Sequence, residues 1–280
     1  MMNDNITIII ITYKSENIIY DFINKIPANI KTIIIENSQN EELKKNIEQK
    51  YKNISFYTKE NNGVSSALNF AVGKVDTKYF LQISPDIDFN YEDLIIFYEY
   101  AKKIDDKFAA IGPRFLDVKA KSHKQIQEEL EFAKIKSIHG SCMFINKKNF
   151  YDIGKFDENF FLYFEETEYC YRGMKKGYSS YQLNKIKVKS RGRSVNTQND
   201  DKQSLNDILI WHFIWSKFYF TKKKYGKFFS IIIFIPLFLR TNLKILYHLA
   251  LKNKDASRKY KFRLDGLIKS AQGKKSYLRP

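Results

Sequence analysis

Ile6-Thr7-Ile8-Ile9-Ile10-Ile11 is the stretch of the sequence that decides the fold. An uninterrupted β-branched run of this length is typical of a strand that is buried on both faces of a parallel sheet. Thr12-Tyr13-Lys14-Ser15 follows, and Ser15 is expected to cap a helix that continues to about Ile26 and ends at Pro27. The chain therefore begins as a strand followed by a helix.

The same alternation of strands and helices continues along the chain. Further strands are expected at 32–35, 54–57, 79–83, 108–113 and 137–145, and further helices at 41–51, 64–73 and 91–104. Residues 117–136 are charged and irregular, which predicts a loop or a short helix. The succession predicts an α/β fold with a mostly parallel, nucleotide-binding type of sheet flanked by helices. Neither the G-x-G-x-x-G fingerprint nor a Walker A sequence occurs.

Composition limits the class of protein. Hydrophobic residues make up 44% of the 280 residues and aromatic residues 16%, which excludes wholesale disorder. The two cysteines, Cys142 and Cys170, are too few for a disulfide framework, so a reduced, cytosolic setting is expected. The first apolar run lacks a basic leader and a small-residue cleavage site, so we expect no secretory signal.

Positive charge is concentrated in the last third of the chain. The net charge is +17, and residues 185–280 hold 23 Lys and Arg against 5 Asp and Glu. Residues 1–184 hold 25 basic and 26 acidic residues, so they are almost neutral. A segregated basic segment favours an anionic partner, either nucleic acid or a membrane surface.

The basic segment is also aromatic and helical in pattern. We therefore divide the chain into a first domain, 1–203, and a helical C-terminal appendage, 204–280. Twelve uncharged residues run from Phe228 to Leu239, between Lys227 and Arg240. A membrane span needs about 20 residues, so this run predicts an element that lies in the membrane interface. A buried core helix is the alternative.

The stretch 160–172 places five apolar or aromatic residues directly before the carboxylates Glu165, Glu166 and Glu168. Aromatic packing can desolvate a carboxylate and raise its pKa, as general-base work requires. Alternatively, the acids only offset the dipole at a helix N-terminus. Both interpretations can hold together, because a base at a helix start is held rigidly.

Polar residues follow several predicted strands at the edge where parallel sheets bind ligands. Asp86 and Asp88 could hold a divalent cation that bridges a diphosphate, or they could simply begin a helix. Glu36-Asn37 could contact a base or ribose, or could cap a turn. His139 is expected in mid-strand as a packed core histidine.

Together these features resemble family 2 glycosyltransferases of the GT-A fold, especially the bacterial rhamnosyltransferase-like branch. The resemblance covers about residues 6–195. The motifs that carry it are Thr12-Tyr13, Glu36-Asn37-Ser38, Asn61-Asn62-Gly63 with Asn69, Ser84-Pro85-Asp86, Gly154-x-Phe156-Asp157-Glu158, and Phe161-Leu162-Tyr163-Phe164-Glu165-Glu166 with Arg172 and Gly177.

The resemblance implies an inverting hexosyl- or deoxyhexosyltransferase that uses a nucleoside-diphosphate sugar and a hydroxyl acceptor on a glycan or lipid carrier. Glu166 matches the presumed general base, and Glu165 is its neighbour, an acceptor-hydroxyl ligand. Glu168 is expected to pair with Arg172. The implied donor-binding residues are Thr12, Tyr13, Glu36, Asn37, Asn62, Gly63, Asn69, Asp86, Arg191 and Arg193.

Two departures bear on the implied Mg²⁺ or Mn²⁺ ion, for which Asp86 and Asp88 are the candidate ligands. Ser84 stands where the family usually has the first metal-side Asp, and residues 189–194 contain no His where the family often has one. We hypothesise that Arg191 or Arg193 instead supplies positive charge to the diphosphate, with a surface basic turn as the alternative.

The expected function is therefore sugar transfer in the synthesis of a surface polysaccharide of the cell envelope. The enzyme is expected in the cytoplasm, peripherally on the inner face of the cell membrane, with the oligomeric state open. A nucleic-acid-binding protein is one alternative, but no such motif occurs and the acidic cluster is an odd companion. A sugar nucleotidyltransferase is the other, and it would be expected to have a Gly-rich, basic N-terminal loop.

Overall fold

The computed structural model describes residues 3–104, 106–117, 125–192 and 199–280. The chain divides into two compact units, which we call the sheet unit and the helical unit. The sheet unit comprises Met1–Asp157 and Glu165–Asn196, and the helical unit comprises Glu158–Phe164 and Thr197–Pro280. The segment Glu158–Phe164 therefore belongs with the C-terminal helices, although the sequence pattern gave no sign of this.

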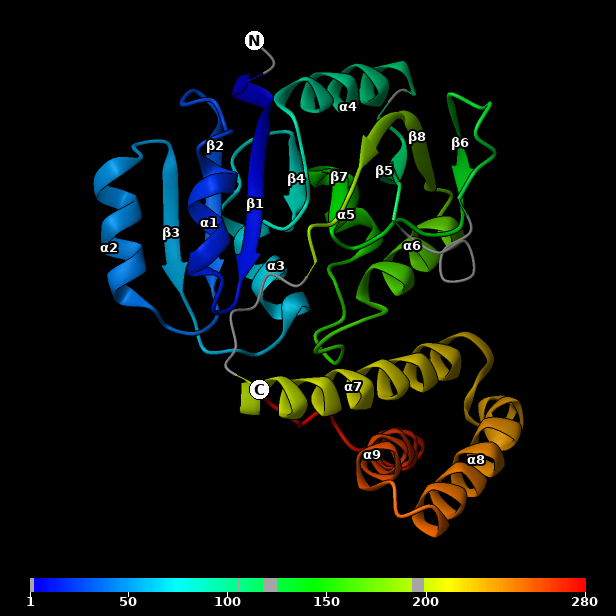
Figure 1. Cartoon of the computed structure of the whole chain (residues 1–280). Helices are drawn as coiled ribbons and strands as arrows, with labels where there is room; N and C mark the ends of the chain where they lie inside the picture. Colours follow the sequence, from blue (N-terminus) through cyan, green and yellow to red (C-terminus); the bar gives the residue numbers. More distant parts are fainter. Residues whose placement is uncertain (1–2, 105, 118–124, 193–198) are drawn as a thin grey trace. The chain divides into compact units, whose positions relative to one another are not determined.

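An eight-stranded sheet forms the centre of the sheet unit (Figure 1). Its strands, in spatial order, are β3 (Ile54–Thr58), β2 (Lys31–Glu36), β1 (Ile6–Thr12), β4 (Tyr79–Ile83), β7 (Cys142–Asn146), β5 (Phe108–Phe115), β8 (Ser179–Val188) and β6 (Phe132–Ile135). Strands β1 to β4 pair in parallel, as do β5 and β8. Strand β7 runs antiparallel to β4 and β5, and β6 runs antiparallel to β8.

Helices cover both faces of this sheet (Figure 1). They are α1 (Glu16–Ile23), α2 (Glu41–Lys50), α3 (Val64–Lys74), α4 (Tyr91–Lys103), α5 (Lys147–Ile153) and α6 (Glu165–Lys175). Alternate residues of β1 enter different cores, because neighbouring side chains of a strand point to opposite faces. Ile8 and Ile10 pack with α1, α2 and α4, whereas Ile9 packs with α3, α5 and α6.

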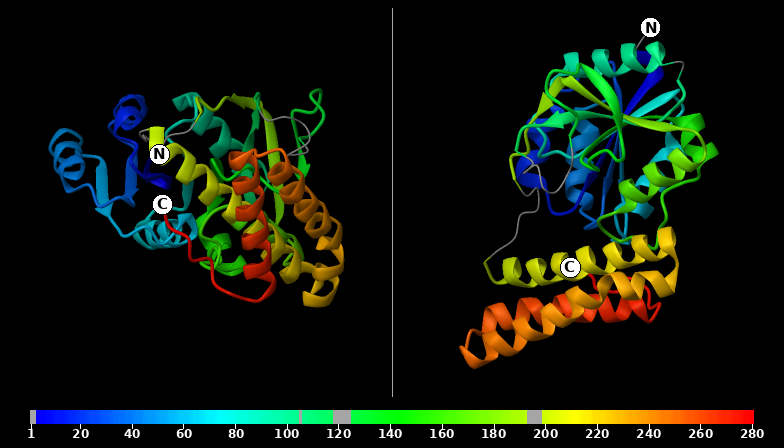
Figure 2. Two further views of the ribbon diagram at one scale, coloured as in Figure 1. Left: turned by 60° about the horizontal axis from the view of Figure 1, so that its bottom comes forward. Right: turned by 90° about the vertical axis from the view of Figure 1, so that its right-hand side faces the viewer.

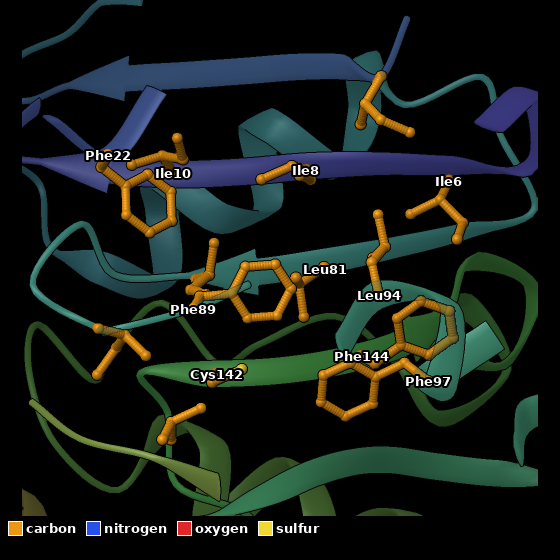
Figure 3. Close-up of a cluster of buried hydrophobic side chains, with 14 of the residues drawn as sticks. Ile6, Ile8, Ile10, Phe22, Leu81, Phe89, Leu94, Phe97, Cys142 and Phe144 are labelled. Atoms are coloured by element: carbon orange, nitrogen blue, oxygen red, sulfur yellow. The ribbon is translucent and has the colours of Figure 1, made fainter. Parts of the chain in front are cut away.

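Figure 3 shows the first of these cores, in which Ile6, Ile8 and Ile10 of β1 face Leu81 of β4 and the aromatic rings of Phe97 and Phe144. Phe97 and Phe144 are stacked, with ring centroids 5.5 Å apart. Burial on both faces explains why the strands of this sheet contain so few polar residues.

The structure corrects the predicted strand 137–145. β7 begins only at Cys142, and His139 lies in the loop before it, partly exposed. The Cys142 amide donates to the His139 carbonyl at 3.2 Å and the Ser141 amide to His139 Nδ1 at 3.2 Å, so the backbone turns here. The mid-strand, core placement of His139 was therefore wrong. Strands β6 and β8 were not predicted, and β6 lies within the segment 117–136.

Three long helices make up most of the helical unit: α7 (Asn199–Tyr225), α8 (Lys227–Ala250) and α9 (Lys254–Ala271). They pack side by side, as Figure 2 shows, around a small core of Ile214, Phe218, Phe234 and Leu267. Helix α8 is 24 residues long, so its apolar part isn't limited to twelve residues. By length and composition alone it could cross a membrane.

Helix α8 is also not the buried core helix that was the alternative. Of its residues only Ser230, Phe234 and Thr241 are buried. Large apolar side chains are exposed along its length: Phe228, Phe229, Ile231, Ile232, Ile233, Ile235, Phe238, Leu239, Leu243, Leu246, Tyr247 and Leu249. Such a surface on a soluble protein marks an interaction site.

Candidate active site

The ends of β1 and β2 meet at the carboxyl edge of the sheet. Thr12 and Glu36 are paired in register, and the Asn37 amide donates to the Thr12 carbonyl at 2.9 Å. Thr12 and Asn37 are both buried, and Tyr13 follows directly, half-buried. The structure therefore brings together the first four residues that the sequence assigned to donor binding.

The Glu36 carboxylate is fully buried and serves the turn that follows it. It accepts the Ser38 amide at 2.9 Å on both oxygens and the Asn40 amide at 2.9 Å. The Ser38 hydroxyl also donates to it. These bonds correspond to the turn-capping alternative, and they fix the backbone between β2 and α2 beside Asn37.

The Asn62-Gly63 pair and Asn69 lie at the start and the middle of α3. Gly63 is the N-cap, with a φ of 95° that favours glycine, and Asn62 is exposed. The Asn69 amide nitrogen donates to the Phe156 carbonyl at 2.9 Å, and its oxygen accepts the Phe156 amide at 3.1 Å. Asn69 thus joins α3 to the loop after α5, so it acts on the site by fixing backbone.

Asp86 lies just after β4 and is partly buried. Its Oδ2 accepts the Ser190 hydroxyl at 2.7 Å, and its carbonyl accepts the Arg191 amide at 2.8 Å. Burial raises the pKa of the Asp86 carboxyl, the Ser190 bond opposes that rise, and the nearby Asp117 carboxylate adds to it. An antiparallel bridge between Ile87 and Ser190 holds the two segments together. Ser190 is a contact that the sequence didn't reveal.

Asp88, two residues further on, is exposed and has two cationic partners. It accepts Arg191 Nη2 at 2.9 Å and Lys25 Nζ at 3.1 Å. These bonds, that of Arg191 foremost, lower the pKa of the Asp88 carboxyl. A metal ion at Asp88 would have to compete with both cations.

Few side chains at this edge of the sheet could therefore act as ligands of a divalent cation. No group of three or more His, Cys, Asp and Glu side chains that could hold a metal occurs within the described part of the chain. Mg²⁺ is often held by one or two carboxylates together with substrate phosphates. Asp86 fits that arrangement as a single protein ligand, whereas Asp88 fits it poorly.

The two arginines that were expected to face a diphosphate have different outcomes. Arg191 lies beside Asp86 through its backbone, and its guanidinium is paired with Asp88. Arg193 lies outside the described residues. The Arg191 guanidinium is about half exposed, so it can exchange Asp88 for a phosphate oxygen without breaking a buried pair.

Glu165 and Glu166 begin α6 and are buried, with 7% and 9% of their surfaces exposed. Burial raises the pKa of both carboxyls, and the charge of Glu166 raises that of Glu165 further. Glu166 Oε1 accepts the Thr167 hydroxyl at 3.0 Å. Glu165 Oε2 is buried and has no hydrogen-bond partner among the described residues. This is the environment that a general base requires.

Glycine is found at position 140, where the chain passes the Glu166 side chain. A Cβ atom at Gly140 would lie 3.5 Å from Glu166 Cγ and 3.6 Å from its Oε2. His139, the preceding residue, packs on Phe115 with ring centroids 4.5 Å apart. His139 and Phe115 line a small cavity of about 20 Å³. The other lining residues are Pro113, Gln125, Ile135, Ser137, Ile138 and Gln182. This cavity could not be predicted from the sequence, because its lining comes from four separate segments.

Glu168 has the structural role that was predicted for it. Its carboxylate is 1% exposed and accepts Arg172 Nε at 2.9 Å on both oxygens. Within the described part of the chain, Glu168 is therefore the one of the three acids with a cationic partner, whereas Glu165 and Glu166 have no ion pair there.

Known proteins resemble this chain in sequence and in fold. The sequence model of glycosyl transferase family 2 matches residues 7–166. The low-salt glycan biosynthesis hexosyltransferase Agl10 of Haloferax volcanii is 25% identical over 198 residues, which cover 62% of this chain and 63% of that protein. An uncharacterized glycosyltransferase of Rickettsia typhi is 26% identical over 231 residues, 76% of this chain and 71% of that protein. The chain thus spans less than two thirds of the archaeal relative.

Among solved structures, that of S. aureus TarS 1-349 in complex with UDP-GlcNAc is similar to this one. The TM-score is 0.54 at 14% sequence identity, and the match covers 98% of this chain and 93% of that chain. The same protein with UDP gives a TM-score of 0.52. At this identity the likeness shows the fold, an α/β sheet flanked by helices, which confirms the predicted class.

Proposed function

The chain belongs to glycosyl transferase family 2, and from that membership we propose that it is an inverting transferase acting on a nucleoside-diphosphate sugar. The predicted GT-A fold is confirmed, whereas the rhamnosyltransferase-like branch stays a prediction. The observation that carries the proposal is the pair of buried acids Glu165 and Glu166, which have no ion-pair partner among the described residues and at which the family match ends.

In the proposed reaction Glu166 takes the proton of the acceptor hydroxyl. The hydroxyl oxygen then attacks the anomeric carbon, and the bond from that carbon to the diphosphate breaks in the same displacement. The raised pKa of Glu166 suits it to hold this proton near neutral pH. Glu165, its buried neighbour, would accept a second acceptor hydroxyl and orient the sugar.

The donor would lie over the carboxyl ends of β1 and β2, where Thr12, Tyr13 and Asn37 meet, with Asn62 and Gly63 at its side. Asn69 and Glu36 support this site by fixing the backbone next to it. If a divalent cation is bound, Asp86 would hold it and the cation would offset charge on the leaving diphosphate. Arg191 would supply positive charge at the same end of the donor.

We further propose that the helical unit docks on the cytoplasmic face of the cell membrane and that the acceptor is a glycan or a lipid-linked glycan of the cell envelope. The exposed apolar side chains of α8 and the basic residues around it support this interfacial placement. Agl10 is named for glycan biosynthesis, which agrees with a glycan acceptor.

A panel of nucleotide sugars tests the transferase proposal. Donor hydrolysis by the full-length protein is measured for each sugar, with Glu166→Gln as the reference that should be inactive. The assay with the best donor is then repeated with EDTA and again with added Mn²⁺. This tests whether a divalent cation or Arg191 supplies the positive charge that offsets the leaving diphosphate. Full loss and full recovery assign the role to a cation at Asp86, and unchanged activity assigns it to Arg191. A panel on which the folded protein is inert would count against the transferase.

A further inference from the structure

Gly140, in the loop before β7, lies against the candidate general base. Outside the adjoining residues, the three atoms nearest to a Cβ at this position would be Glu166 Cγ, Cδ and Oε2, at 3.5, 3.6 and 3.6 Å. These are ordinary van der Waals distances, and the φ of Gly140 lies outside the positive range that favours glycine. Alanine therefore fits here without a clash among the described residues. The missing side chain leaves the Glu166 carboxylate uncovered.

The loop that carries this glycine is fixed on both sides. The Ser141 amide donates to His139 Nδ1 at 3.2 Å, and the Cys142 amide donates to the His139 carbonyl at 3.2 Å. The Ser141 carbonyl accepts the Ser84 amide at 2.9 Å. Ser84 is two residues before Asp86, the candidate ligand of a cation on the leaving diphosphate. The loop therefore connects the segment beside the diphosphate with the candidate base, which is where an acceptor hydroxyl has to lie.

The two oxygens of the Glu166 carboxylate have different surroundings. Oε1 accepts the Thr167 hydroxyl at 3.0 Å, whereas Oε2 is the oxygen nearer to Gly140. The bond from Thr167 restricts rotation of the carboxylate, so Oε2 keeps its direction towards Gly140. A general base must have an oxygen within hydrogen-bond reach of the proton that it takes. Oε2 is the oxygen that Thr167 does not engage.

We propose that Glu166 Oε2 takes the acceptor proton, that Gly140 determines specificity by leaving room for the acceptor's carbon atoms beside Oε2, and that Thr167 is a positioning residue that holds Oε1. The inference rests on the proposed transferase function. The proton passes to Oε2 as the hydroxyl oxygen bonds to the anomeric carbon and the nucleoside diphosphate leaves. A sugar hydroxyl brings carbon atoms close to position 140, whereas water does not. Glycine therefore favours transfer to an alcohol over hydrolysis of the donor.

The experiment compares Gly140→Ala with Gly73→Ala in the full-length protein. Gly73 is an exposed residue of α3, and a Cβ atom there would meet no described atom within 4 Å outside the backbone of its own helix. The best donor of the panel is incubated in water that contains glycerol, and the free sugar and the glyceryl glycoside are measured in the same reaction. Their ratio does not depend on the amount of active enzyme, so a partly unfolded variant keeps the wild-type ratio.

We expect Gly140→Ala to lower the ratio of glyceryl glycoside to free sugar about tenfold, because the methyl group displaces glycerol more than it displaces water. The donor KM should stay within twofold of that of the wild type, and Gly73→Ala should keep the wild-type ratio. Equal ratios for the two variants would overturn the role of Gly140. A wild type that hydrolyses the donor but forms no glyceryl glycoside would also count against an opening for alcohols beside Oε2.

A second measurement needs no donor. The Glu166 carboxyl is titrated by NMR in Thr167→Val and in Thr167→Ser, which keeps the hydroxyl. Burial raises the pKa of Glu166 and the Thr167 bond opposes that rise, so Thr167→Val should move the midpoint upward and Thr167→Ser should match the wild type. The titratable neighbours are Glu165 and the Cys170 thiol, and burial raises the pKa of Cys170 to about 11, so that thiol stays neutral. Equal midpoints in the two variants would overturn positioning by Thr167.

The same titration tests Gly140 apart from the transferase proposal. Gly140→Ala should move the Glu166 midpoint upward, because the added methyl group removes water from Oε2, and Gly73→Ala should not. If no sugar of the panel is turned over but the midpoints shift in this way, the described carboxylate geometry stands and the transferase proposal fails. An unchanged midpoint in Gly140→Ala would mean that position 140 does not face the open side of the carboxylate.

Discussion

Arg172 Nε lies 2.9 Å from both carboxylate oxygens of Glu168, one helical turn earlier in α6. The other guanidinium nitrogens donate to the carbonyls of Ile153 at 2.9 Å, Gly154 at 2.8 Å and Lys155 at 2.7 Å. One side chain therefore neutralises a buried acid and fastens the loop after α5 to the helix that carries the candidate base.

Replacing this arginine should destabilise the protein strongly. Arg172→Lys keeps a charge but loses the planar fork that reaches four oxygen-bearing partners. A lysine ammonium cannot contact Glu168 and the three carbonyls at once, so oxygens that Arg172 now satisfies lose their partner and the free energy of unfolding should fall by about 3 kcal/mol. Urea unfolding measures this, with Lys176→Gln as the control, because Lys176 is exposed and lies directly after the same helix. Equal unfolding free energies for the two variants would refute the assignment.

Glu166→Gln should abolish transfer and leave nucleotide binding intact. Loss of a general base costs about 10²–10⁴-fold in kcat, whereas donor binding depends on the strand ends of β1 and β2. Nucleoside diphosphate affinity by calorimetry and turnover of the best donor separate these effects. Glu42→Gln, an exposed acid of α2, is the control. Retained turnover would move the base elsewhere, with Glu165 as the first candidate.

The sequence predicts a strand correctly where the side chains on both faces of that strand are buried. Ile6–Ile11 reads as a strand because its side chains are apolar on both faces, and the paired strands β2 and β4 share this property. Strand β8 was missed because its buried positions include Gln182 and Asn184, which resemble surface residues. Gln182 Nε2 donates to Asn184 Oδ1 at 2.7 Å, and Asn184 Nδ2 donates to the carbonyls of Gln127 and Leu130 at 2.7 Å. The last two partners are more than fifty residues away in the chain, so only folding brings them to β8.

The candidate site was only partly predictable for the same reason. The positions of Thr12, Asn37 and Asp86 follow from strand ends, which periodicity locates. Whether an acid faces a ligand or its own backbone depends on the following turn, as Glu36 shows with its bonds to Ser38 and Asn40. Phe160–Phe164 packs with the C-terminal helices through contacts between residues more than fifty positions apart in the sequence, such as that of Leu162 with Ser216. Local sequence patterns do not predict such contacts.

The stability of the protein should depend on pH through Glu165. Its pKa is raised in the folded protein by burial, so the folded state keeps a proton that the unfolded chain loses above its usual pKa of 4.5. This contribution to stability is present in full below pH 4.5 and is lost as the pH rises. Glu165→Gln removes the titrating group, so the variant does not lose this part of its stability as the pH rises. The unfolding free energy of the variant should therefore rise relative to that of the wild type between pH 4.5 and 8. A difference that doesn't change with pH would contradict the burial of an unpaired acid.

Membrane docking through α8 predicts a specific loss of vesicle binding. Phe229→Asp with Ile232→Asp places charges on two side chains that are 62% and 48% exposed. Each apolar side chain that no longer inserts costs about 1.5–3 kcal/mol, so binding should fall at least tenfold. Co-sedimentation with vesicles containing anionic lipid measures it. Met174→Asp, a 57% exposed residue of α6, is the control, and binding that the double variant retains would exclude docking by α8.

His212 should make the helical unit sensitive to acid. Burial lowers the pKa of its imidazole to about 4 from 6.5, the nearby Arg279 charge adds to this, and the bond to the Leu278 carbonyl opposes it. Between these values the unfolded chain binds a proton that the folded protein doesn't, so stability falls as the pH drops from 6.5 to 4. The full loss is about 3 kcal/mol for a shift of this size.

Urea unfolding at pH 4, 5, 6 and 7 measures this dependence in the wild type and in His212→Gln. The variant should be less stable at pH 7, because the packing on Phe161 and the bond to Ser276 are altered. The difference in unfolding free energy between the wild type and the variant should shrink towards pH 4, because protonation of the buried His212 destabilises the wild type there. His248→Gln in α8 is the matched control and should keep the dependence of the wild type. A deficit of His212→Gln that stays constant from pH 7 to 4 would mean that His212 accepts a proton without loosening its hold on Phe161.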